Sequence, residues 1–408
     1  MKCRHCRAEL TETFLDLGAA PPSNAYLDRD ALSAAEVTYP LKLFVCTACW
    51  LVQTEDYAAA DQFFSPDYAY FSSVSQSWLA HAARYAEAIT RRLKLGAESF
   101  VVEVASNDGY LLKNFVAAGI PCLGVEPTAS TARAAEAIGI PTLREFFGAK
   151  LAKRLVSEGK SADLILGNNV YAHVPDINDF TAGLCAILKP GGCVTLEFPH
   201  LMRLMEQNQF DTVYHEHFSY LSITTVSRIF RENGLRIFDV EELGTHGGSL
   251  RVYGCALADP RPELPAVATV LTAEMAFGLQ SVDTYRAFQA RADQVKNALV
   301  AFLIEQKRIG RRVAAYGAAA KGNTLLNYGG VRSDLLSFVC DAAPSKQNKF
   351  MPGSRIPILP PAALREAKPD VVLILPWNIA DEVCRQHAYV REWGGEFMVA
   401  VPELRVLR

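Results

Sequence analysis

Short apolar runs alternate with helix-like segments along most of the chain. In the central part, a run at residues 99–105 leads into a helix-like segment at 110–118, and further apolar runs follow at 121–126, 162–170 and 193–199. Continuous apolar runs bounded by turn residues are typical of strands buried in a parallel sheet. We expect a turn at 188–192, where Pro and two Gly precede the last of these strands.

The same pattern returns near the C-terminus. Residues 312–324 read as a strand, a turn of small residues and a helix start, and later apolar runs lie at 336–341 and 370–378. Between the two regions, residues 263–308 show helical apolar spacing. The pattern therefore predicts an α/β protein with two Rossmann-like sheets separated by a long helical region.

Size and composition narrow the function classes. The chain has 408 residues, is 50% hydrophobic and carries a formal net charge of −3. It can therefore fill two or three domains, and the charge argues against a nucleic-acid partner. We expect no membrane partner and a cytosolic protein, because there is neither an apolar signal core at the start nor an apolar run of bilayer length.

Two Cys-x-x-Cys pairs lie near the N-terminus, about 40 residues apart. They are Cys3 with Cys6 and Cys46 with Cys49, and residues 39–45 between them read as a strand. Cysteines of a cytosolic protein are mostly reduced, so this spacing predicts a structural zinc ion held by four thiolates. A redox pair is the alternative, but no thioredoxin-like unit surrounds either motif.

The first central strand ends in a candidate cofactor turn. Residues 103–110 read Glu-Val-Ala-Ser-Asn-Asp-Gly-Tyr, and a second acid, Glu126, ends the next strand about 20 residues on. Such a turn lets backbone amides approach a nucleotide-like ligand. Gly109 is its only glycine, so a pyrophosphate-binding Gly-x-Gly-x-x-Gly turn is absent. An ordinary strand-to-helix turn is the alternative.

The densest chemistry lies in the Tyr-His-Glu-His block at residues 214–217. In an extended stretch His215 and His217 would share one face, with Tyr214 and Glu216 on the other. A metal site, a hydrogen-bonded structural turn and an acid/base cluster are three open interpretations. His173 follows the 162–170 strand at the edge where ligands bind in such sheets, which favours catalysis.

Other candidates are more isolated. Residues 61–78 mix aromatic rings with hydroxyl groups and read as a packed connector that could also line a pocket. A glycine-rich turn at 244–248 could place His246 and Arg251 at a pocket, although a hairpin explains it equally well. In the C-terminal region, polar side chains suited to phosphate or sugar contacts follow the strands; they are Tyr316, Lys321, Asn323, Lys346 and Lys349.

Taken together, these motifs resemble a known family. The turn at 103–110 is similar to the first loop of S-adenosylmethionine (SAM) methyltransferases. The cysteine pairs, this turn, the 214–217 block and the turn after residue 316 occur in the order found in sugar C-methyltransferases that build branched deoxysugars. The resemblance covers nearly the whole chain. It departs at Ala105, where relatives usually have glycine.

The resemblance implies three domains. They are a zinc-binding domain at 1–70, a Rossmann-like SAM methyltransferase domain at 71–255 and a Rossmann-like domain at 256–408 that contributes to sugar-nucleotide binding. The substrate implied is a 4-keto-6-deoxysugar, usually linked to dTDP, that is methylated at C-3 with inversion. We expect a monomer.

Site roles are likewise implied by the resemblance. His217 would be the base that takes the C-3 proton. His173, Tyr214 and Tyr68 would act on the keto-sugar, and Glu216 would orient an imidazole. SAM would be bound by Glu103, Ser106, Asn107, Gly109, Glu126 and Asn168. Substrate contacts would come from His246, Arg251, Tyr316, Lys321 and Asn323, and the metal ligands would be Cys3, Cys6, Cys46 and Cys49.

Two alternatives belong to other classes. An NAD-dependent sugar-nucleotide oxidoreductase or epimerase could use one of the two sheets, but neither turn has the dinucleotide glycines. A non-catalytic scaffold could use the zinc domain to dock a partner.

Overall fold

The computed structural model describes residues 1–57 and 71–407, so the predicted site residue Tyr68 lies outside the described part of the chain. The chain forms two compact units, each assembled from three separate stretches. Unit 1 consists of Met1–Leu10, Cys46–His200 and Phe218–Gln280. Unit 2 consists of Thr11–Val45, Leu201–His217 and Ser281–Arg408. The chain therefore passes from one unit to the other five times.

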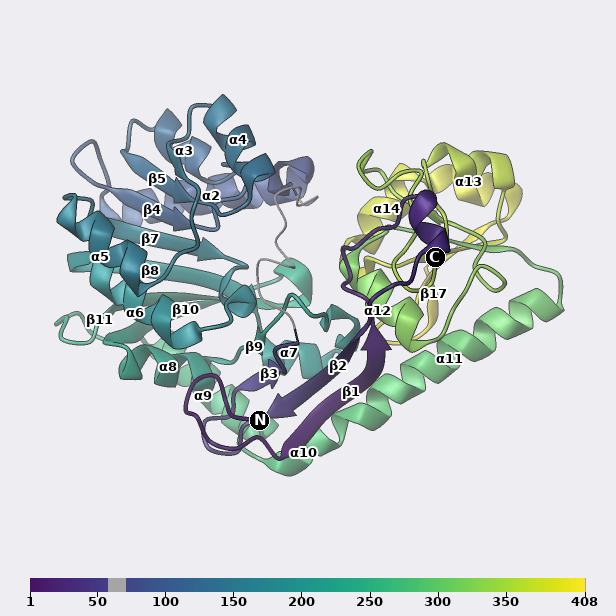
Figure 1. The fold of residues 1–408 in the computed structure, drawn as a ribbon, viewed down its shortest axis with the longest axis horizontal. Helices are drawn as coiled ribbons and strands as arrows, with labels where there is room; N and C mark the ends of the chain where they lie inside the picture. The colour runs from purple at the N-terminus through teal and green to yellow at the C-terminus, as the bar shows by residue number, and fades with distance from the viewer. Residues whose placement is uncertain (58–70, 408) are drawn as a thin grey trace. The chain divides into compact units, whose positions relative to one another are not determined.

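Unit 1 is built around a seven-stranded sheet (Figure 1). Its strands are β4 (Val101–Val104), β5 (Cys122–Val125), β6 (Thr142–Leu143), β7 (Ala162–Asn168), β8 (Leu188–Pro199), β10 (Leu235–Leu243) and β11 (Ser249–Ala256). The order is β10–β11–β8–β7–β4–β5–β6. Strands β4 to β8 are parallel, whereas β11 is antiparallel to both β8 and β10. The carboxyl ends of the parallel strands therefore meet at one edge of this sheet.

One sequence expectation in this sheet is wrong. Residues 188–192 do not form a turn before the strand, because β8 already begins at Leu188, which pairs with Ala162 of β7. The next paired positions are Cys193 and Leu164, so the residues between Leu188 and Cys193 form a bulge opposite a single residue of β7. Gly191 within the bulge has φ +76°, a conformation that suits glycine.

Seven α-helices lie within the described residues of unit 1. They are α2 (Gln76–Leu93), α3 (Leu112–Ala117), α4 (Ala129–Ala137), α5 (Ala149–Ser157), α6 (Ile177–Ile187), α8 (Ile223–Glu232) and α9 (Pro265–Phe277). Helix α2 buries Ala82, Tyr85, Ala86 and Ile89, which are spaced along one helical face. That face shares a core with side chains of β4, β7 and β8, so α2 is fixed on the sheet.

The N-terminal part of unit 1 holds little regular structure among its described residues. Strand β3 (Val52–Thr54) pairs antiparallel with β9 (Ser219–Tyr220), which joins residues near the second cysteine pair to the chain just after His217. Short 3-10 turns lie at η2 (Ser72–Val74), η3 (Tyr171–His173) and η5 (Thr245–Gly247).

Unit 2 contains a six-stranded sheet and a long hairpin. The sheet order is β14–β13–β12–β15–β16–β17, parallel except for β17. The strands are β12 (Val313–Tyr316), β13 (Val339–Cys340), β14 (Ile358–Leu359), β15 (Val371–Ile374), β16 (Glu396–Val399) and β17 (Arg405–Leu407). The hairpin pairs β1 (Glu12–Ala20) with β2 (Tyr39–Val45). Both predicted Rossmann-like sheets are thus confirmed.

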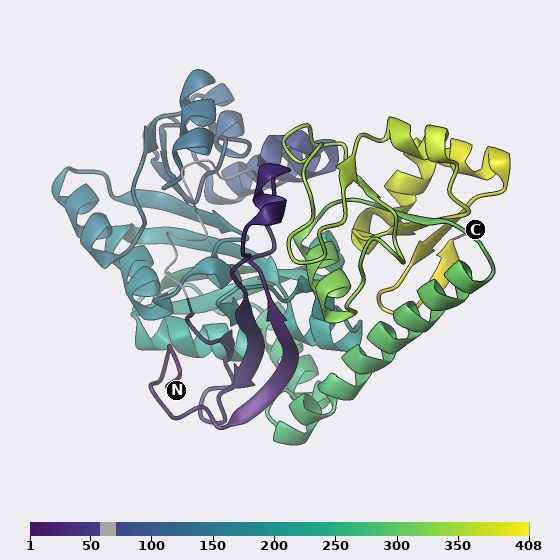
Figure 2. The same cartoon turned by 45° about the vertical axis from the view of Figure 1, so that its right-hand side comes forward.

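The helices of unit 2 are α7 (Leu201–Glu206), α10 (Val282–Arg286), α11 (Phe288–Arg308), α12 (Ala320–Tyr328), α13 (Ala362–Ala367) and α14 (Ala380–Gln386), with a 3-10 turn η4 (Phe210–Thr212). Hairpin strand β1 lies along α10 and α11 (Figure 2), because Phe14 stacks on Phe288 at 5.0 Å between ring centroids and meets Tyr285 edge-on. The predicted helical region at 263–308 is therefore three helices, α9 to α11.

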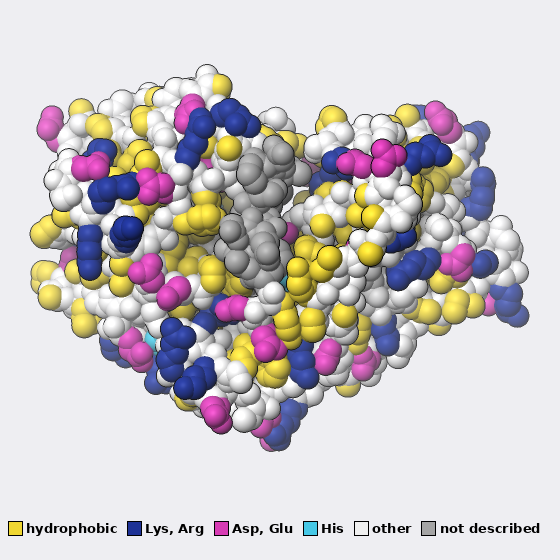
Figure 3. Space-filling model, in the orientation of Figure 1, with side chains coloured by type: hydrophobic (Ala, Val, Ile, Leu, Met, Phe, Trp, Pro, Cys, Tyr) yellow, Lys and Arg dark blue, Asp and Glu magenta, His cyan; other side chains and the backbone are white. Residues whose placement is uncertain are grey.

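Charged side chains of both signs are interspersed on the face drawn in Figure 3. Within residues 1–57 and 71–407, no helix has the length and apolarity required to cross a bilayer.

Candidate active site

The predicted cofactor turn follows β4 and contains three residues in the left-handed region. Ala105, Asn107 and Gly109 have φ values of +55°, +50° and +77°. A Cβ atom at Gly109 would lie 2.8 Å from Cγ1 of Ile140, so glycine is favoured there by space as well as by conformation. Ala105 holds a left-handed conformation that glycine would adopt without strain, so alanine at this position costs roughly 1–2 kcal/mol.

Glu126 closes this turn. It follows β5, and its carboxylate accepts hydrogen bonds from the backbone N–H of Asn107 at 2.9 Å, from the backbone N–H of Thr128 at 2.9 Å and from the Thr128 hydroxyl. The turn is also held from outside, since Asn107 and Asp108 side chains accept from the backbone N–H groups of Ser72 and Ser73. The start of the segment leading into α2 therefore anchors the cofactor turn.

Several predicted cofactor residues carry buried polar atoms without partners among the described residues. Among these atoms are Oε2 of Glu103 and both amide atoms of Asn168. The pKa of Glu103 lies well above its usual value because the side chain is buried and because Glu126 and Asp108 add negative charge nearby. Buried polar atoms usually have partners. A ligand with hydrogen-bond donors or a positive group would supply them here, so these residues fit a polar cofactor. The buried Ser106 hydroxyl lies in the same turn and also has no described partner.

Arg251 and His246 belong to a buried polar cluster at the same sheet edge. Glu197 of β8 is fully buried and accepts from Arg251 Nη2 at 2.7 Å, from His81 Nε2 at 3.0 Å and from the Thr245 hydroxyl at 3.1 Å. Burial raises the pKa of Glu197, but His81 and Arg251 outweigh it and bring the pKa below its usual value. Arg251 thus forms an ion pair with another side chain of unit 1.

His246 is placed by its neighbours. Its Nε2 accepts from the Asn169 side chain at 3.2 Å, and its ring meets Trp78 edge-on at 5.2 Å. Trp78 also stacks on His81 at 4.9 Å. Neither His81 nor Glu197 was singled out from the sequence, because an isolated His on a helix and an isolated Glu in a strand carry no recognisable spacing.

The Tyr-His-Glu-His block belongs to unit 2 and is a turn, not an extended stretch. The backbone N–H of His217 donates to the carbonyl of Tyr214 at 3.0 Å, which closes the turn. The Tyr214 and His217 rings are therefore brought together, with centroids 4.0 Å apart. The expected alternation of faces is wrong, because period-two alternation holds only where the backbone is extended.

The two histidines of the block differ in their surroundings. His217 Nδ1 lies 3.1 Å from the carbonyl oxygen of Thr212. A carbonyl only accepts, so Nδ1 carries the hydrogen and Nε2 of the neutral ring holds the lone pair. His215 Nε2 lies 3.2 Å from the carbonyl of Tyr39, and burial lowers the pKa of His215. His217 is therefore the better candidate base of the two.

Glu216 forms a hydrogen bond with the segment between β1 and β2. The Glu216 carboxylate accepts from the Asn24 side chain at 2.7 Å, and two residues on, the Tyr26 hydroxyl donates to the carbonyl of Ala318 at 2.5 Å. Ala318 lies in the turn after β12, so this connecting segment joins Glu216 to the second Rossmann-like sheet within unit 2. The burial of Tyr26, with Asp341 and Glu216 nearby, raises the pKa of its hydroxyl.

A cluster of three side chains includes a residue that lies just before the block in the chain. It contains Asp211, Lys321 and Trp377, of which Asp211 precedes Tyr214 by three residues. Trp377 Nε1 donates to Asp211 at 2.8 Å, and Lys321 Nζ lies 4.5 Å from the centre of the Trp377 ring. Burial raises the pKa of Asp211 to about 6, against the opposing effect of Lys321. Burial also lowers the pKa of Lys321, although Asp211 opposes the shift. Only Lys321 of the three was predicted from sequence, since Asp211 and Trp377 stand in no recognisable motif.

Helix α12 holds the block from the other side. The Thr324 hydroxyl donates to the carbonyl of Val213 at 2.7 Å, directly before Tyr214. Asn323 is buried and donates to the carbonyl of Ser23. Tyr316 ends β12, and its ring lies 4.5 Å from that of His387. Of the other predicted lysines, Lys346 donates to Ala318 at 2.9 Å and Lys349 lies 3.8 Å from an Asp28 carboxylate oxygen. The C-terminal candidates and the block thus belong to one unit.

His173 belongs to unit 1. It ends the short turn η3, which directly follows the β7 strand that ends with Asn168. Its backbone N–H donates to the carbonyl of Val170 at 2.8 Å. The structure therefore brings His173 and Asn168 to the same strand end.

The four predicted metal ligands converge. The sulfur atoms of Cys3, Cys6, Cys46 and Cys49 all lie within 4.8 Å of one another. The Cys3–Cys49 and Cys6–Cys46 pairs are 3.6 and 3.5 Å apart, near the roughly 3.8 Å expected for thiolates on a tetrahedral zinc ion. Four thiols leave no open position, so this donor set fits a structural zinc ion.

Comparison with known proteins identifies the family. The chain is 34% identical over 406 residues to "C-methyltransferase NovU" of Streptomyces niveus, an alignment that covers 100% of this chain and 96% of that protein. The chain belongs to the SAM-dependent C-methyltransferases.

Three family models match successive parts of this C-methyltransferase. "Putative zinc binding domain" matches residues 3–64, "Methyltransferase domain" matches 77–240 and "C-methyltransferase C-terminal domain" matches 244–402. The predicted recognition of a C-methyltransferase is therefore confirmed. The two predicted cofactors are confirmed as well. The methyltransferase domain supports SAM, and the four cysteines are arranged to hold a metal ion.

Two solved structures match the C-methyltransferase over less than half of its length. A SAM-dependent methyltransferase from Mesorhizobium loti is 15% identical, with a TM-score of 0.35, and the match covers 43% of this chain and 99% of that one. Magnesium protoporphyrin IX methyltransferase from Synechocystis PCC 6803 is 13% identical, with a TM-score of 0.34, and covers 43% and 84%.

Proposed function

We propose that this C-methyltransferase removes the C-3 proton of a nucleotide-linked 4-keto-6-deoxysugar, carried on dTDP, and methylates that carbon. A sugar carbon becomes a nucleophile only after deprotonation, and a neighbouring ketone makes the proton acidic by delocalising the charge into an enolate. The reaction thus needs a base and hydrogen-bond donors for the developing oxyanion. It belongs to branched-deoxysugar biosynthesis.

The observation that carries the proposal is the tautomer of His217. Because Nδ1 donates to the carbonyl of Thr212, Nε2 is the nitrogen of the neutral ring that can accept a proton. The Tyr214 ring lies against the His217 ring, which restrains its orientation. His217 then takes the C-3 proton on Nε2, and the imidazolium is stabilised by its bond to the Thr212 carbonyl.

Donors for the enolate oxygen come from side chains, since the four-thiol site has no open coordination position. Tyr214 and His173 orient or polarise the ketone in this proposal, and Tyr68 acts near the sugar. Glu216, held by Asn24, orients an imidazole of the block in this proposal. Lys321 and Tyr316 contact the nucleotide-sugar from the C-terminal region, together with Asn323.

The cofactor residues hold SAM in this proposal. Glu126 binds the ribose hydroxyls. The buried side-chain atoms of Glu103 and Asn168 that have no described partner form hydrogen bonds with polar groups of the cofactor. Ser106, Asn107 and Gly109 let the turn approach it closely. When bound, SAM supplies an electrophilic methyl group. His246 and Arg251 complete the acceptor side, Arg251 by holding Glu197 and the His246 turn in place.

A labelling experiment tests the proposal. The protein is incubated with methyl-deuterated SAM and dTDP-, GDP- or CDP-linked 4-keto-6-deoxysugars, and the products are analysed by mass spectrometry. We expect a labelled methyl on carbon for the dTDP sugar. If SAM binds but no sugar gains the label, the proposed acceptor is wrong.

His217→Asn tests the base. We expect methyl transfer to fall roughly 10²- to 10⁴-fold, and exchange of the C-3 proton with deuterated water, followed by NMR, to slow as well. His215→Asn is the matched control, because His215 faces the carbonyl of Tyr39, and it should retain exchange. Full exchange in His217→Asn would exclude His217 as the base.

A further inference from the structure

The first Cys-x-x-Cys motif, the Cys3–Cys6 knuckle, contains two buried side chains that are not among the four predicted metal ligands. Arg4 and His5 stand between the two cysteines and are 6% and 4% exposed. An arginine is rarely buried without a specific reason. Both side chains reach out of the knuckle to chain segments near proposed site residues.

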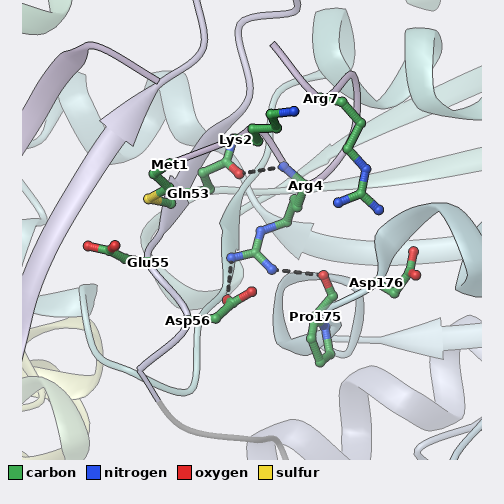
Figure 4. A pocket seen from close by; sticks show the side chains of 9 residues that line it. All are labelled: Met1, Lys2, Arg4, Arg7, Gln53, Glu55, Asp56, Pro175 and Asp176. Carbon is green, nitrogen blue, oxygen red and sulfur yellow. Dashed lines mark hydrogen bonds and ion pairs between the residues drawn. The ribbon is translucent and has the colours of Figure 1, made fainter. Parts of the chain in front are cut away.

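Arg4 contacts the segment that follows His173. Its Nη1 donates to the carbonyl of Pro175 at 2.8 Å, two residues after His173. Its Nη2 donates to the carbonyl of Thr54 at 2.9 Å and to the Asp56 carboxylate at 2.8 Å. Arg4 is among the residues that line a pocket of about 430 Å³. Figure 4 shows its guanidinium directed toward Asp56 and Pro175.

The same guanidinium lies against the residue that follows His217. Its central carbon is 5.3 Å from the centre of the Phe218 ring, within the range of a cation–π contact. The backbone of Phe218 is fixed in turn, because its carbonyl accepts from the N–H of Thr54 at 3.2 Å. Arg4 therefore touches the chain just after each of the two proposed catalytic histidines.

His5 holds the far end of the His173 segment. Its Nδ1 donates to the Asn178 side-chain oxygen at 2.8 Å, and Asn178 Nδ2 donates back to the carbonyl of His5 at 2.9 Å. Asn178 lies in the first turn of α6, so Arg4 and His5 together bracket residues 175–178.

The knuckle itself is tied to this arrangement through Gln53. Gln53 Nε2 donates to the sulfur of Cys3 at 3.2 Å, and Gln53 Oε1 accepts from the backbone N–H of Arg4 at 2.8 Å (Figure 4). Partners of ligand atoms orient metal sites. A shift of the ligand sulfur would therefore be passed to Arg4 and onward to Pro175.

We propose that Arg4 is a positioning residue that couples the four-cysteine site to the His173 turn, with His5 as its companion. The inference rests on the proposed role of His173 for its catalytic consequence, although the coupling itself does not depend on that role. The metal site then serves the reaction without touching substrate, because its knuckle fixes the segment from which His173 acts.

Hydrogen–deuterium exchange of the full chain tests the coupling. Arg4→Gln removes charge-assisted bonds to Pro175, Thr54 and Asp56, so amides in residues 173–180 should exchange roughly tenfold faster. Amides of the cofactor turn at 105–112 should be unchanged, and zinc content measured by elemental analysis should stay complete. Unchanged exchange at 173–180 in a folded, zinc-loaded Arg4→Gln protein would overturn the proposal.

Two further variants sharpen the test. Arg7→Gln is the matched control, because Arg7 lines the same cavity but is exposed, and it should match the wild type. Asn178→Ala cuts the His5 contact from outside the knuckle and should also speed exchange at 173–180, so it decides the question if Arg4→Gln does not fold. Normal exchange in Asn178→Ala would then count against the coupling.

Kinetics separate this proposal from the proposed function. Arg4→Gln should lower kcat roughly tenfold and leave KM for SAM unchanged. His173→Asn should also lower kcat. If His173→Asn keeps wild-type kcat, the catalytic role of His173 is wrong, while the exchange result still decides the coupling.

Discussion

At the residue scale, burial outweighs the favourable neighbours of Asp211, whereas the neighbours of Glu197 outweigh burial. Asp211 lies fully buried beside a lysine and accepts from an indole, yet the pKa of its carboxyl rises to about 6 because desolvation outweighs both favourable partners. Lys321 responds in the opposite sense, as burial of a cation requires.

Asp211→Asn tests this balance. A carboxyl whose folded pKa exceeds its unfolded value favours folding below the unfolded pKa, and this contribution is lost as pH rises through about 6. The wild type should therefore lose stability relative to Asp211→Asn between about pH 4 and pH 7, by up to roughly 3 kcal/mol. Urea unfolding at a series of pH values measures this difference. A difference that does not change with pH would show that Asp211 is ionised at little cost.

Residue identity also shows where sequence reasoning ends. The zinc ligands and the cofactor turn could be predicted because each rests on a short local motif, the Cys-x-x-Cys pair and the strand-to-helix turn. Asp211, Trp377 and Glu197 could not, since each meets its partners only through tertiary packing. The tautomer of His217 depends on a backbone carbonyl five residues away, which no side-chain motif records.

At the scale of elements, the carboxyl edge of the unit 1 sheet is held by ion pairs across strands. Glu197 of β8 pairs in register with Arg251 of β11, and His81 reaches both from α2. The strand at 193–199 was predicted from the sequence, but its alignment with β11 at this edge comes from the register.

A double-mutant cycle tests this edge. Arg251→Leu leaves the buried Glu197 carboxylate with less compensation and should lower the free energy of unfolding by about 3–5 kcal/mol. Arg251→Leu combined with Glu197→Leu should be less destabilised than the sum of the two single variants. Urea denaturation provides the free energies, and strict additivity would contradict a coupled pair.

The block at 214–217 shows how an element can be misassigned. Apolar runs predict strands and helices well, but four consecutive polar and aromatic residues have no period to follow. One backbone bond from His217 to Tyr214 makes them a turn and decides which side chains meet.

At the scale of the whole molecule, the four-cysteine site closes a long loop. Its ligands bring residues 3 and 49 together, and the chain between them includes the whole β1–β2 hairpin of unit 2. Holding such a loop closed restricts the unfolded chain, so the metal should contribute to stability.

Zinc removal by a chelator should therefore lower Tm by roughly 5–15 °C, measured by calorimetry, and added zinc should restore it. Cys49→Ser should reproduce the loss, whereas Cys185→Ser, which changes a cysteine outside the group of four, should keep the response to chelator. A Tm indifferent to chelation would show that the four thiols do not rely on a metal.

The division of the chain into interleaved stretches has a consequence for its ancestry. The Tyr214–His217 turn and the β1–β2 hairpin lie in unit 2, yet both are encoded upstream of residue 256. A recombination event that replaced only the last third of the gene would bring in a new second sheet while keeping the old hairpin and histidine turn. New acceptor specificities should therefore arise by point substitution within intact genes more readily than by exchange of the C-terminal segment.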